Sequence, residues 1–489
     1  MRSKPIHDPA CASSHADLTE GTKKERRVIL ADHPPRTACR WVGARREPTT
    51  PRSYGRRSVR ERRVRRVAGL LRARLPELDL EAVPDVRARE GRWSLAEILT
   101  GVLLGIVAGA RSLAEAEELT DGMSPAARRL ASVPRRLPDT TARDALCAVP
   151  LDGLRAALHR LVRAAWRRKA LTPVDLPVGV VALDGKVTAL PTLNHPLIQN
   201  QHPDVGLPYG LARTVTCALV SAPGRPCIDA VPIPAETNEA GHFQHVLAGL
   251  VETYGALFQV VTYDAGALSE ANGAAVVAAG KDYVFALKND HFTMVKLATE
   301  LLDPHEIAAR REDVLDNATT ATREIQILAV DPSHGYGAGK GPEESVWSHA
   351  RTFLRVTSTV RRSGVVIERD SRLFVSSRAA DQLTPDQWLQ VVRAHWGVEN
   401  NNHHTLDTAF AEDERPWIAA DANGMLAVLL LRRIAYTLLA LFRAVTLRSD
   451  DHRAMRWLAL LRWVRDALIV LSAEHVENLR LRSLAVATR

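Results

Sequence analysis

Three acidic residues, Asp184, Asp264 and Glu399, belong to separate segments that could bring them together. Asp184 follows the apolar run 178–183 and Asp264 follows the run 258–263, and both runs have the composition of buried strands. Glu399 lies in a segment with helical periodicity. Because strand ends deliver side chains into one crevice of such a sheet, we expect the three carboxylates to share one site. Their hard oxygen atoms suit Mg²⁺ or Mn²⁺, and paired ions of this kind catalyse phosphoryl transfer.

Other polar residues accompany these acids. Spacings of four residues relate His395, Glu399, His403 and Asp407, so one uninterrupted helix would align them along one face. A lysine follows each of two predicted strands. The candidates for DNA binding or for support of the acids are Lys186, Lys288, His395, Asn400, His403 and Asp407. Taken singly, such residues are more often part of a solvated polar surface.

The central part of the chain alternates between strand and helix patterns. Strands are predicted at 178–183, 214–220, 227–233, 258–263 and 283–288. Helices are predicted at 238–253, at 268–279 and from residue 291 onward. Three strands followed by alternating helices and strands is the order of an RNase H-like α/β fold, a mixed sheet flanked by helices.

The remaining segments suggest further parts. Residues 351–359 and 365–375 predict a β-hairpin, and Ser94 with Glu97 predicts a capping box at the start of a helix. We divide the chain into an Arg-rich disordered arm (1–65), a helical N-terminal domain (66–172), the first part of the RNase H-like core (173–302), a β-rich insertion (303–382), a catalytic helix that completes the core (383–415) and a helical C-terminal region (416–489).

The positive charge of the protein is concentrated at its N-terminus. The chain has a net charge of +9, residues 1–66 carry +11, and the remainder carries −2. The composition of the arm favours disorder. Its arginines would either bind DNA phosphates or belong to an extension without a selected role.

Cysteines and apolar runs restrict the classes that remain. The five cysteines form no Cys-x-x-Cys pair, which argues against a zinc site and fits a reducing compartment. The apolar runs 95–110 and 425–442 contain charged residues, so we predict buried helices and no membrane partner. The N-terminus does not resemble a signal peptide. We therefore expect a cytoplasmic protein.

Several motifs occur in the same order as in one known family. They are Asp184-Gly185-Lys186, Thr237-Asn238-Glu239, Asp264-Ala265, the segment 282–288, the segment 395–400, His403, Leu406-Asp407 and Glu412-Asp413. With these motifs the chain resembles the H-repeat-associated (ISAs-type) insertion-sequence transposases of the DDE recombinase superfamily. The resemblance covers roughly residues 70 to 445.

The resemblance implies a function. It implies that Asp184, Asp264 and Glu399 are catalytic metal ligands for Mg²⁺ or Mn²⁺. It also implies cleavage and strand transfer of double-stranded DNA, at the terminal repeats of an element and at a target, by a homodimer or larger assembly.

Two alternatives remain open at this stage. An RNase H-like nuclease without strand transfer would need the same acids. A degenerate copy that only binds DNA would agree with the departures from the family pattern, such as Asn402-His403-His404 where the family has Leu-His-Trp.

Overall fold

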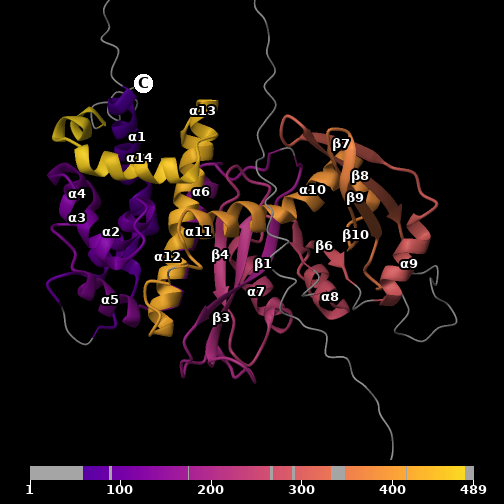
Figure 1. Ribbon diagram of the computed structural model, residues 1–489, viewed down its shortest axis with the longest axis horizontal. Helices are drawn as coiled ribbons and strands as arrows, with labels where there is room; N and C mark the ends of the chain where they lie inside the picture. Colours follow the sequence, from indigo (N-terminus) through magenta and orange to yellow (C-terminus); the bar gives the residue numbers. More distant parts are fainter. Residues whose placement is uncertain are drawn as a thin grey trace, which may run out of the picture.

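A large mixed β-sheet forms the centre of the protein, with helices on its faces (Figure 1). The computed structural model describes residues 59–87, 91–174, 176–264, 268–288, 292–331, 347–414 and 416–479. In this part of the chain the sheet has ten strands. They are β1 (Val180–Leu190), β2 (Ile198–Gln201), β3 (Tyr209–Leu219), β4 (Cys227–Pro232), β5 (Val260–Tyr263), β6 (Asp282–Leu287), β7 (Ala309–Val314), β8 (Thr319–Ala329), β9 (Thr352–Arg362) and β10 (Val365–Ser376).

The strand order is β2-β3-β1-β5-β6-β10-β9-β8-β7, and β4 pairs with β3 as well. Strands β1, β5 and β6 are mutually parallel, whereas β3 is antiparallel to β1. The five strands predicted from the apolar runs are all present. Helices α7 (Glu239–Tyr254), α8 (Glu270–Ala278) and α9 (Phe292–Leu302) alternate with the later strands as expected.

Strands β7 to β10 extend the central sheet. The predicted hairpin is confirmed as β9 and β10, which turn at Ser363 and Gly364, both with positive φ. Strand β10 then pairs antiparallel with β6 through Leu373–Ser376. The β-rich segment is therefore hydrogen-bonded to the central strands and forms one sheet with them.

Helices from the N-terminal part of the described chain pack beside the sheet (Figure 1). They are α1 (Val59–Arg74), α2 (Leu95–Val107), α3 (Leu113–Gly122), α4 (Pro125–Ala131), α5 (Asp139–Ala148) and α6 (Leu151–Arg167). The predicted capping box of Ser94 and Glu97 opens α2.

The boundary predicted for the disordered arm is wrong, because residues 59–65 already belong to α1. Val64, Val67 and Leu71 recur at helical spacing in α1 and are buried, which orders the helix. Residues 1–58, the rest of the predicted arm, lie outside the described residues.

The C-terminal helices pack against this helical layer. Their bounds are α12 (Ala422–Leu441), α13 (Asp450–Arg453) and α14 (Trp457–Val470), and a π-helix, Phe442–Thr446, extends α12. Within the described residues one helical segment, Ala422–Thr446, is apolar and long enough to cross a membrane, but its apolar stretch is wholly buried inside the protein. The predicted buried helices at 95–110 and 425–442 are both confirmed.

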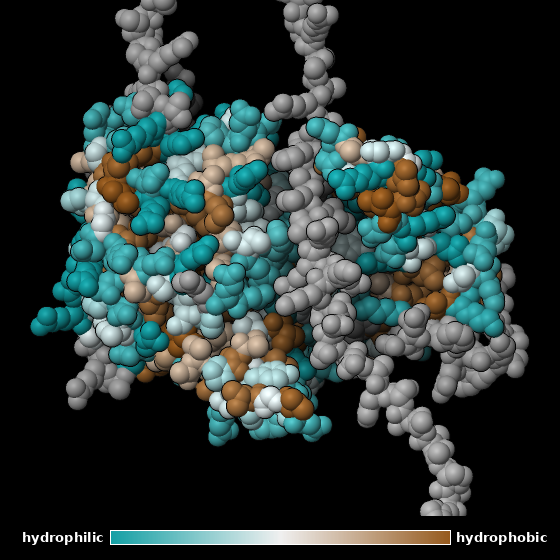
Figure 2. Space-filling view, in the orientation of Figure 1, coloured by the Kyte–Doolittle hydropathy of each residue, from teal (hydrophilic) through white to brown (hydrophobic). Residues whose placement is uncertain are grey.

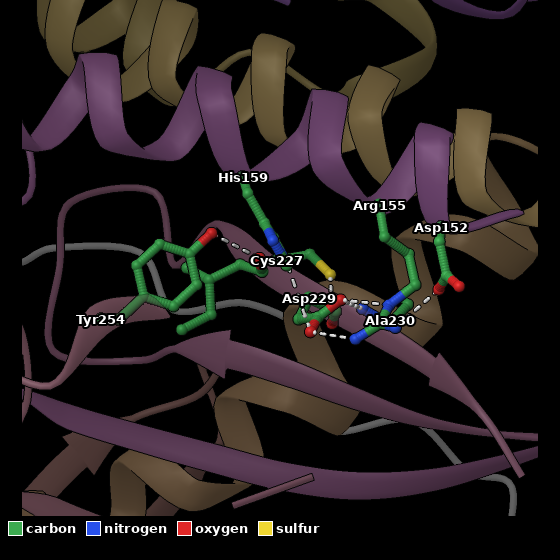
Figure 3. Close-up of polar contacts among 8 residues, drawn as sticks. Asp152, Arg155, His159, Cys227, Asp229, Ala230 and Tyr254 are labelled. Carbon is green, nitrogen blue, oxygen red and sulfur yellow. Dashed lines mark hydrogen bonds and ion pairs between the residues drawn. The ribbon is translucent and has the colours of Figure 1, made fainter. Parts of the chain in front are cut away.

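A buried ionic contact ties the N-terminal helices to the sheet (Figure 3). Arg155 of α6 donates two hydrogen bonds to Asp229 of β4, at 3.0 and 2.8 Å. His159 Nε2, one turn further along α6, lies 3.2 Å from Asp229 Oδ2. Burial acts to raise the pKa of Asp229, but His159 and Arg155 outweigh it and lower the pKa to about 2. Asp229 is thus a charged anchor between two layers of the fold.

Candidate active site

The sheet places Asp184 and Asp264 side by side. Strands β1 and β5 are parallel neighbours, and their last paired residues are Leu183 and Tyr263. The next residue of each strand is the aspartate, so the two Cα atoms are separated by about one strand spacing, roughly 5 Å. The prediction that Asp184 ends its strand is wrong, because β1 continues to Leu190 while paired with β3. The parallel pairing is what ends at Asp184.

Both aspartates project from the same face of the sheet. Val180, Ala182 and Val260 belong to the core cluster that also contains the buried face of α10 (Pro385–Gly397). Side chains two residues apart in a strand point to the same face, so Asp184 and Asp264 are directed toward α10 and the helical segment after it. Asp184 is half-buried, and Asp264 lies at the surface end of β5.

Glu399 lies in a π-helix. Helix α10 begins with a capping box of Thr384 and Gln387 and ends at Gly397. The π-helix Val398–His403 follows, and α11 (His404–Thr408) continues it, so that one helical rod crosses the sheet near β1 (Figure 1). The prediction of one uninterrupted α-helix is therefore wrong. A π turn holds more residues than an α turn. The four-residue spacing therefore no longer aligns Glu399 with His395, His403 and Asp407 on one helix face.

Two histidines of this rod contact the sheet on either side of Glu399. His395 Nδ1 lies 3.1 Å from Thr262 Oγ1 in β5. His403 Nδ1 lies 3.2 Å from Asp184 Oδ2 in β1. Burial lowers the pKa of His395, although Asp184 and Asp264 oppose this effect, so the ring is neutral near pH 7. These contacts hold the helical rod to β5 on one side of Glu399 and to β1 on the other.

The three acids influence one another electrostatically. Desolvation and then the charge of Asp184 raise the pKa of Glu399, and Asp264 adds to the effect. Glu399 itself is exposed as a residue, so its carboxylate is accessible at the surface of the crevice. The carboxylate oxygens of Asp184, Asp264 and Glu399 do not all lie within 4.8 Å of one another in the described structure, although hard oxygen donors of this kind suit Mg²⁺ or Mn²⁺.

The remaining surface candidates lie at the rim. Lys288, which follows β6, forms an ion pair of 3.1 Å with Asp264, and both side chains are at least half exposed. Asn400 is exposed beside Glu399. Both are accessible to a large substrate approaching the crevice.

A second acidic group surrounds Lys186, two residues after Asp184 in β1. Asp407, Glu412 and Asp413 have carboxylate oxygens within 4.8 Å of one another. In the part of the chain that the structure describes, they are the one group of three acids that meets this distance. The ammonium of Lys186 lies among them, in contact with Asp407, 3.4 Å from Glu412 and 3.1 Å from Asp413. Because Lys186 already supplies the cation, this group is a salt-bridge cluster and offers a poor site for a metal.

Helix α12 also contacts this salt-bridge cluster. Arg433 is fully buried and pairs with Glu412, which is 1% exposed. Burial acts to raise the pKa of Glu412, but Arg433 and Lys186 lower it to about 2. The sequence shows Arg432-Arg433 only as an interruption of an apolar run. A pair of adjacent arginines in an otherwise apolar helix was the one signal that a buried acid faces it.

Glu239, the first residue of α7, is an acid near the site that the sequence left without a role. A Cβ atom at Gly185 would lie 2.3 Å from Glu239 Oε1, so any larger residue after Asp184 would have to displace the Glu239 side chain. Burial raises the pKa of Glu239, Arg213 opposes this, and Asp184 adds to it. The Asp-Gly-Lys motif thus combines a half-buried acid, a glycine in contact with the Glu239 side chain and a buried cation.

Comparison with known proteins gives structural similarity of limited extent. No family model and no curated protein matches the sequence. Among solved structures, the chain is similar to one in the cryo-EM structure of a piggyBac transposase synaptic complex with hairpin DNA. The match has 10% sequence identity and a TM-score of 0.37, and it covers 86% of this chain and 79% of that chain. A score of this size is too low to establish a common fold.

Proposed function

We propose that this protein is a DNA transposase of the DDE type that cuts and joins double-stranded DNA by metal-dependent phosphoryl transfer. The observation that carries the proposal is the register of β1 and β5. It sets Asp184 beside Asp264 on one face of the sheet, and the π-helix that carries Glu399 contacts β1.

The strand order supports the same proposal. The order β4-β3-β1-β5-β6, with β3 antiparallel and β1, β5 and β6 parallel, has the arrangement of an RNase H-like core. The H-repeat-associated family named above is the finer assignment that we propose on the motifs of the sequence. In this fold the crevice beyond the carboxyl ends of the parallel strands is the expected place for chemistry.

The residues of the crevice have distinct parts in the proposed reaction. Asp184, Asp264 and Glu399 would hold the divalent ions, which activate the attacking oxygen and stabilise the leaving oxygen. His403 holds Asp184, and the neutral His395 holds the helical turn on Thr262, so that the acids keep their places. Lys288 and Asn400 are positioned to contact phosphate groups of a DNA strand at the rim.

The proposal is tested with the full chain and linear DNA that carries the sequences flanking its own gene. With Mg²⁺ we expect strand breaks at defined positions, and with EDTA none. Asp264→Asn should abolish the breaks. Asp144→Asn, at an exposed position of α5, is the control and should cut as the wild type does. Failure of the wild type to cut in either Mg²⁺ or Mn²⁺ would refute the enzyme and leave a DNA-binding protein.

A strand-transfer assay separates the transposase from a simple nuclease on the same fold. A pre-cut DNA end is supplied together with a supercoiled target. Joined products are expected from a transposase, whereas cutting without joining would assign the nuclease.

A further inference from the structure

The first arginines of the described residues belong to a folded helix, α1. Helix α1 contains seven arginines and one acid, Glu61, in 16 residues. Its apolar residues Val64, Val67 and Leu71 are buried, which leaves Arg60, Arg62 and Arg63 exposed. A 16-residue helix is about 24 Å long, a span comparable to about seven base pairs of DNA.

A second source of arginines packs beside α1. Helix α14 lies against α1 at one end of the protein (Figure 1). Trp463 and Val464 face the core, and the helix exposes Arg462 and Arg465, with Arg456 at its N-terminal cap. In Figure 2 hydrophilic side chains predominate over this end of the molecule, with apolar side chains between them.

Direct contacts join the two sets. Arg63 lies over the ring of Trp463, 5.4 Å from its centroid. Arg66 Nη1 lies 3.1 Å from His452 Nδ1 in α13. Burial and then the charges of Arg66 and Arg63 lower the pKa of His452, as expected where positive charges converge.

The charge of this surface differs from that of the rest of the body. Helix α1 and residues 450–470 together hold eleven arginines and four acids, a net charge of +7. The rest of the chain from residue 59 onward carries a net charge of −5. Every basic residue of the two segments apart from His452 is an arginine, the side chain whose planar donors match phosphate oxygens best.

We infer that the surface formed by α1, α13 and α14 binds the backbone of double-stranded DNA outside the acidic crevice. The choice of DNA among polyanions rests on the proposed function. The concentration of arginine on two packed helices is independent of it. A site of this kind contributes affinity and positioning, since phosphate contacts carry no base sequence.

The test measures binding of a 30-base-pair duplex to the full chain in EDTA, over a series of NaCl concentrations. The variant replaces Arg60, Arg456, Arg462 and Arg465 by glutamine. Each phosphate contact contributes roughly 0.9 to the slope of log K against log salt, so the slope should fall by about 3 to 4 and low-salt affinity by at least about tenfold. Circular dichroism and the melting temperature check that the variant is folded.

The matched control removes four exposed arginines from the opposite end of the sheet: Arg310, Arg311, Arg362 and Arg369. The control has the same net charge as the variant and should keep the wild-type slope within about 1. Equal losses in both would show that only net charge matters, and an unchanged slope in the α1–α14 variant would overturn the inference.

Two further measurements separate DNA binding from membrane binding, and this inference from the proposed function. Loss of binding to vesicles of anionic lipid, with DNA binding unchanged, would assign the surface to membranes and also overturn the inference. DNA cleavage is scored in a parallel reaction with Mg²⁺. If the wild type does not cut but the variant loses its salt slope, the proposed function fails and the DNA-binding surface stands.

Discussion

Lys186 Nζ lies 3.4 Å from Glu412 Oε1, and both side chains are buried although 226 residues separate them in the chain. The contact joins the strand that carries Asp184 to the segment that follows the helix carrying Glu399. Burial acts to lower the pKa of Lys186, but Glu412 and Asp407 together outweigh it and the pKa is raised. The charged lysine therefore stabilises the fold at neutral pH, and holds together the two elements that bring the proposed metal ligands into one site.

Replacement of Lys186 by methionine should destabilise the protein strongly. Asp407, Glu412 and Asp413 would then face one another without their shared cation. Breaking a buried ion pair in this way costs about 3 to 5 kcal/mol in the free energy of unfolding, measured by urea denaturation. Glu412→Gln should destabilise the Lys186→Met variant less than it destabilises the wild type, because the two side chains are coupled. Strict additivity would contradict this account of the cluster.

Glu399→Gln should abolish cutting and leave DNA binding nearly unchanged. The amide keeps the shape of the carboxylate and removes the charge that would hold a divalent ion, so we expect at least roughly a 100-fold loss of cleavage rate. DNA affinity, measured in EDTA, should stay within about twofold or increase slightly, since a negative charge near phosphates is lost. Normal cutting by Glu399→Gln, with none by Asp407→Asn, would show that Asp407 is the metal ligand on this helical rod.

The Asp229 anchor should make stability depend on pH. The pKa of Asp229 is lowered from 3.8 to about 2, so the folded state binds fewer protons than the unfolded state between these values. The stabilisation is complete above pH 3.8 and is lost as the pH falls through about 2; it amounts to roughly 2 kcal/mol. Urea denaturation of the wild type and Asp229→Asn should differ by about 3 kcal/mol at pH 7 and clearly less at pH 3. A difference that does not change with pH would refute the charged anchor.

Truncation should distinguish the predicted arm from α1. A chain that begins at residue 59 keeps the helix and should melt within about 2 °C of the full protein. A chain that begins at residue 75 loses Val64, Val67 and Leu71 from the core, each worth about 1.5 to 3 kcal/mol, and should melt at least about 5 °C lower or fail to fold. Equal melting temperatures would show that α1 adds nothing to the stability of the core.

The helices and strands whose apolar residues recur with one clear spacing could be predicted from the sequence. The runs 178–183, 258–263 and 283–288 are apolar and β-branched or aromatic, and each is a strand between buried layers. Strand β7 was missed because Ala309–Val314 consists mainly of charged residues and lies at the edge of the sheet. Edge strands carry a weaker apolar signal than central ones.

The site was predicted in part for a similar reason. Residue types and order led us to propose Asp184, Asp264 and Glu399, an assignment that stays a prediction, and they gave no partner of any side chain. The pairing of Lys186 with Glu412, or of Arg433 with Glu412, depends on long-range folding that no local pattern encodes. The π-helix was also invisible, because the polar spacing of His395, His403 and Asp407 agrees equally well with a regular helix.

The π-helix between Gly397 and His403 makes this part of the chain sensitive to length. Each residue of an α-helix turns the chain by about 100°. Deletion of one residue here would restore regular winding and rotate α11 by that angle, away from β1. Asp407 would then leave Lys186, and His403 would leave Asp184. A substitution in this turn alters one contact, whereas a change in the number of its residues would displace every contact that follows it.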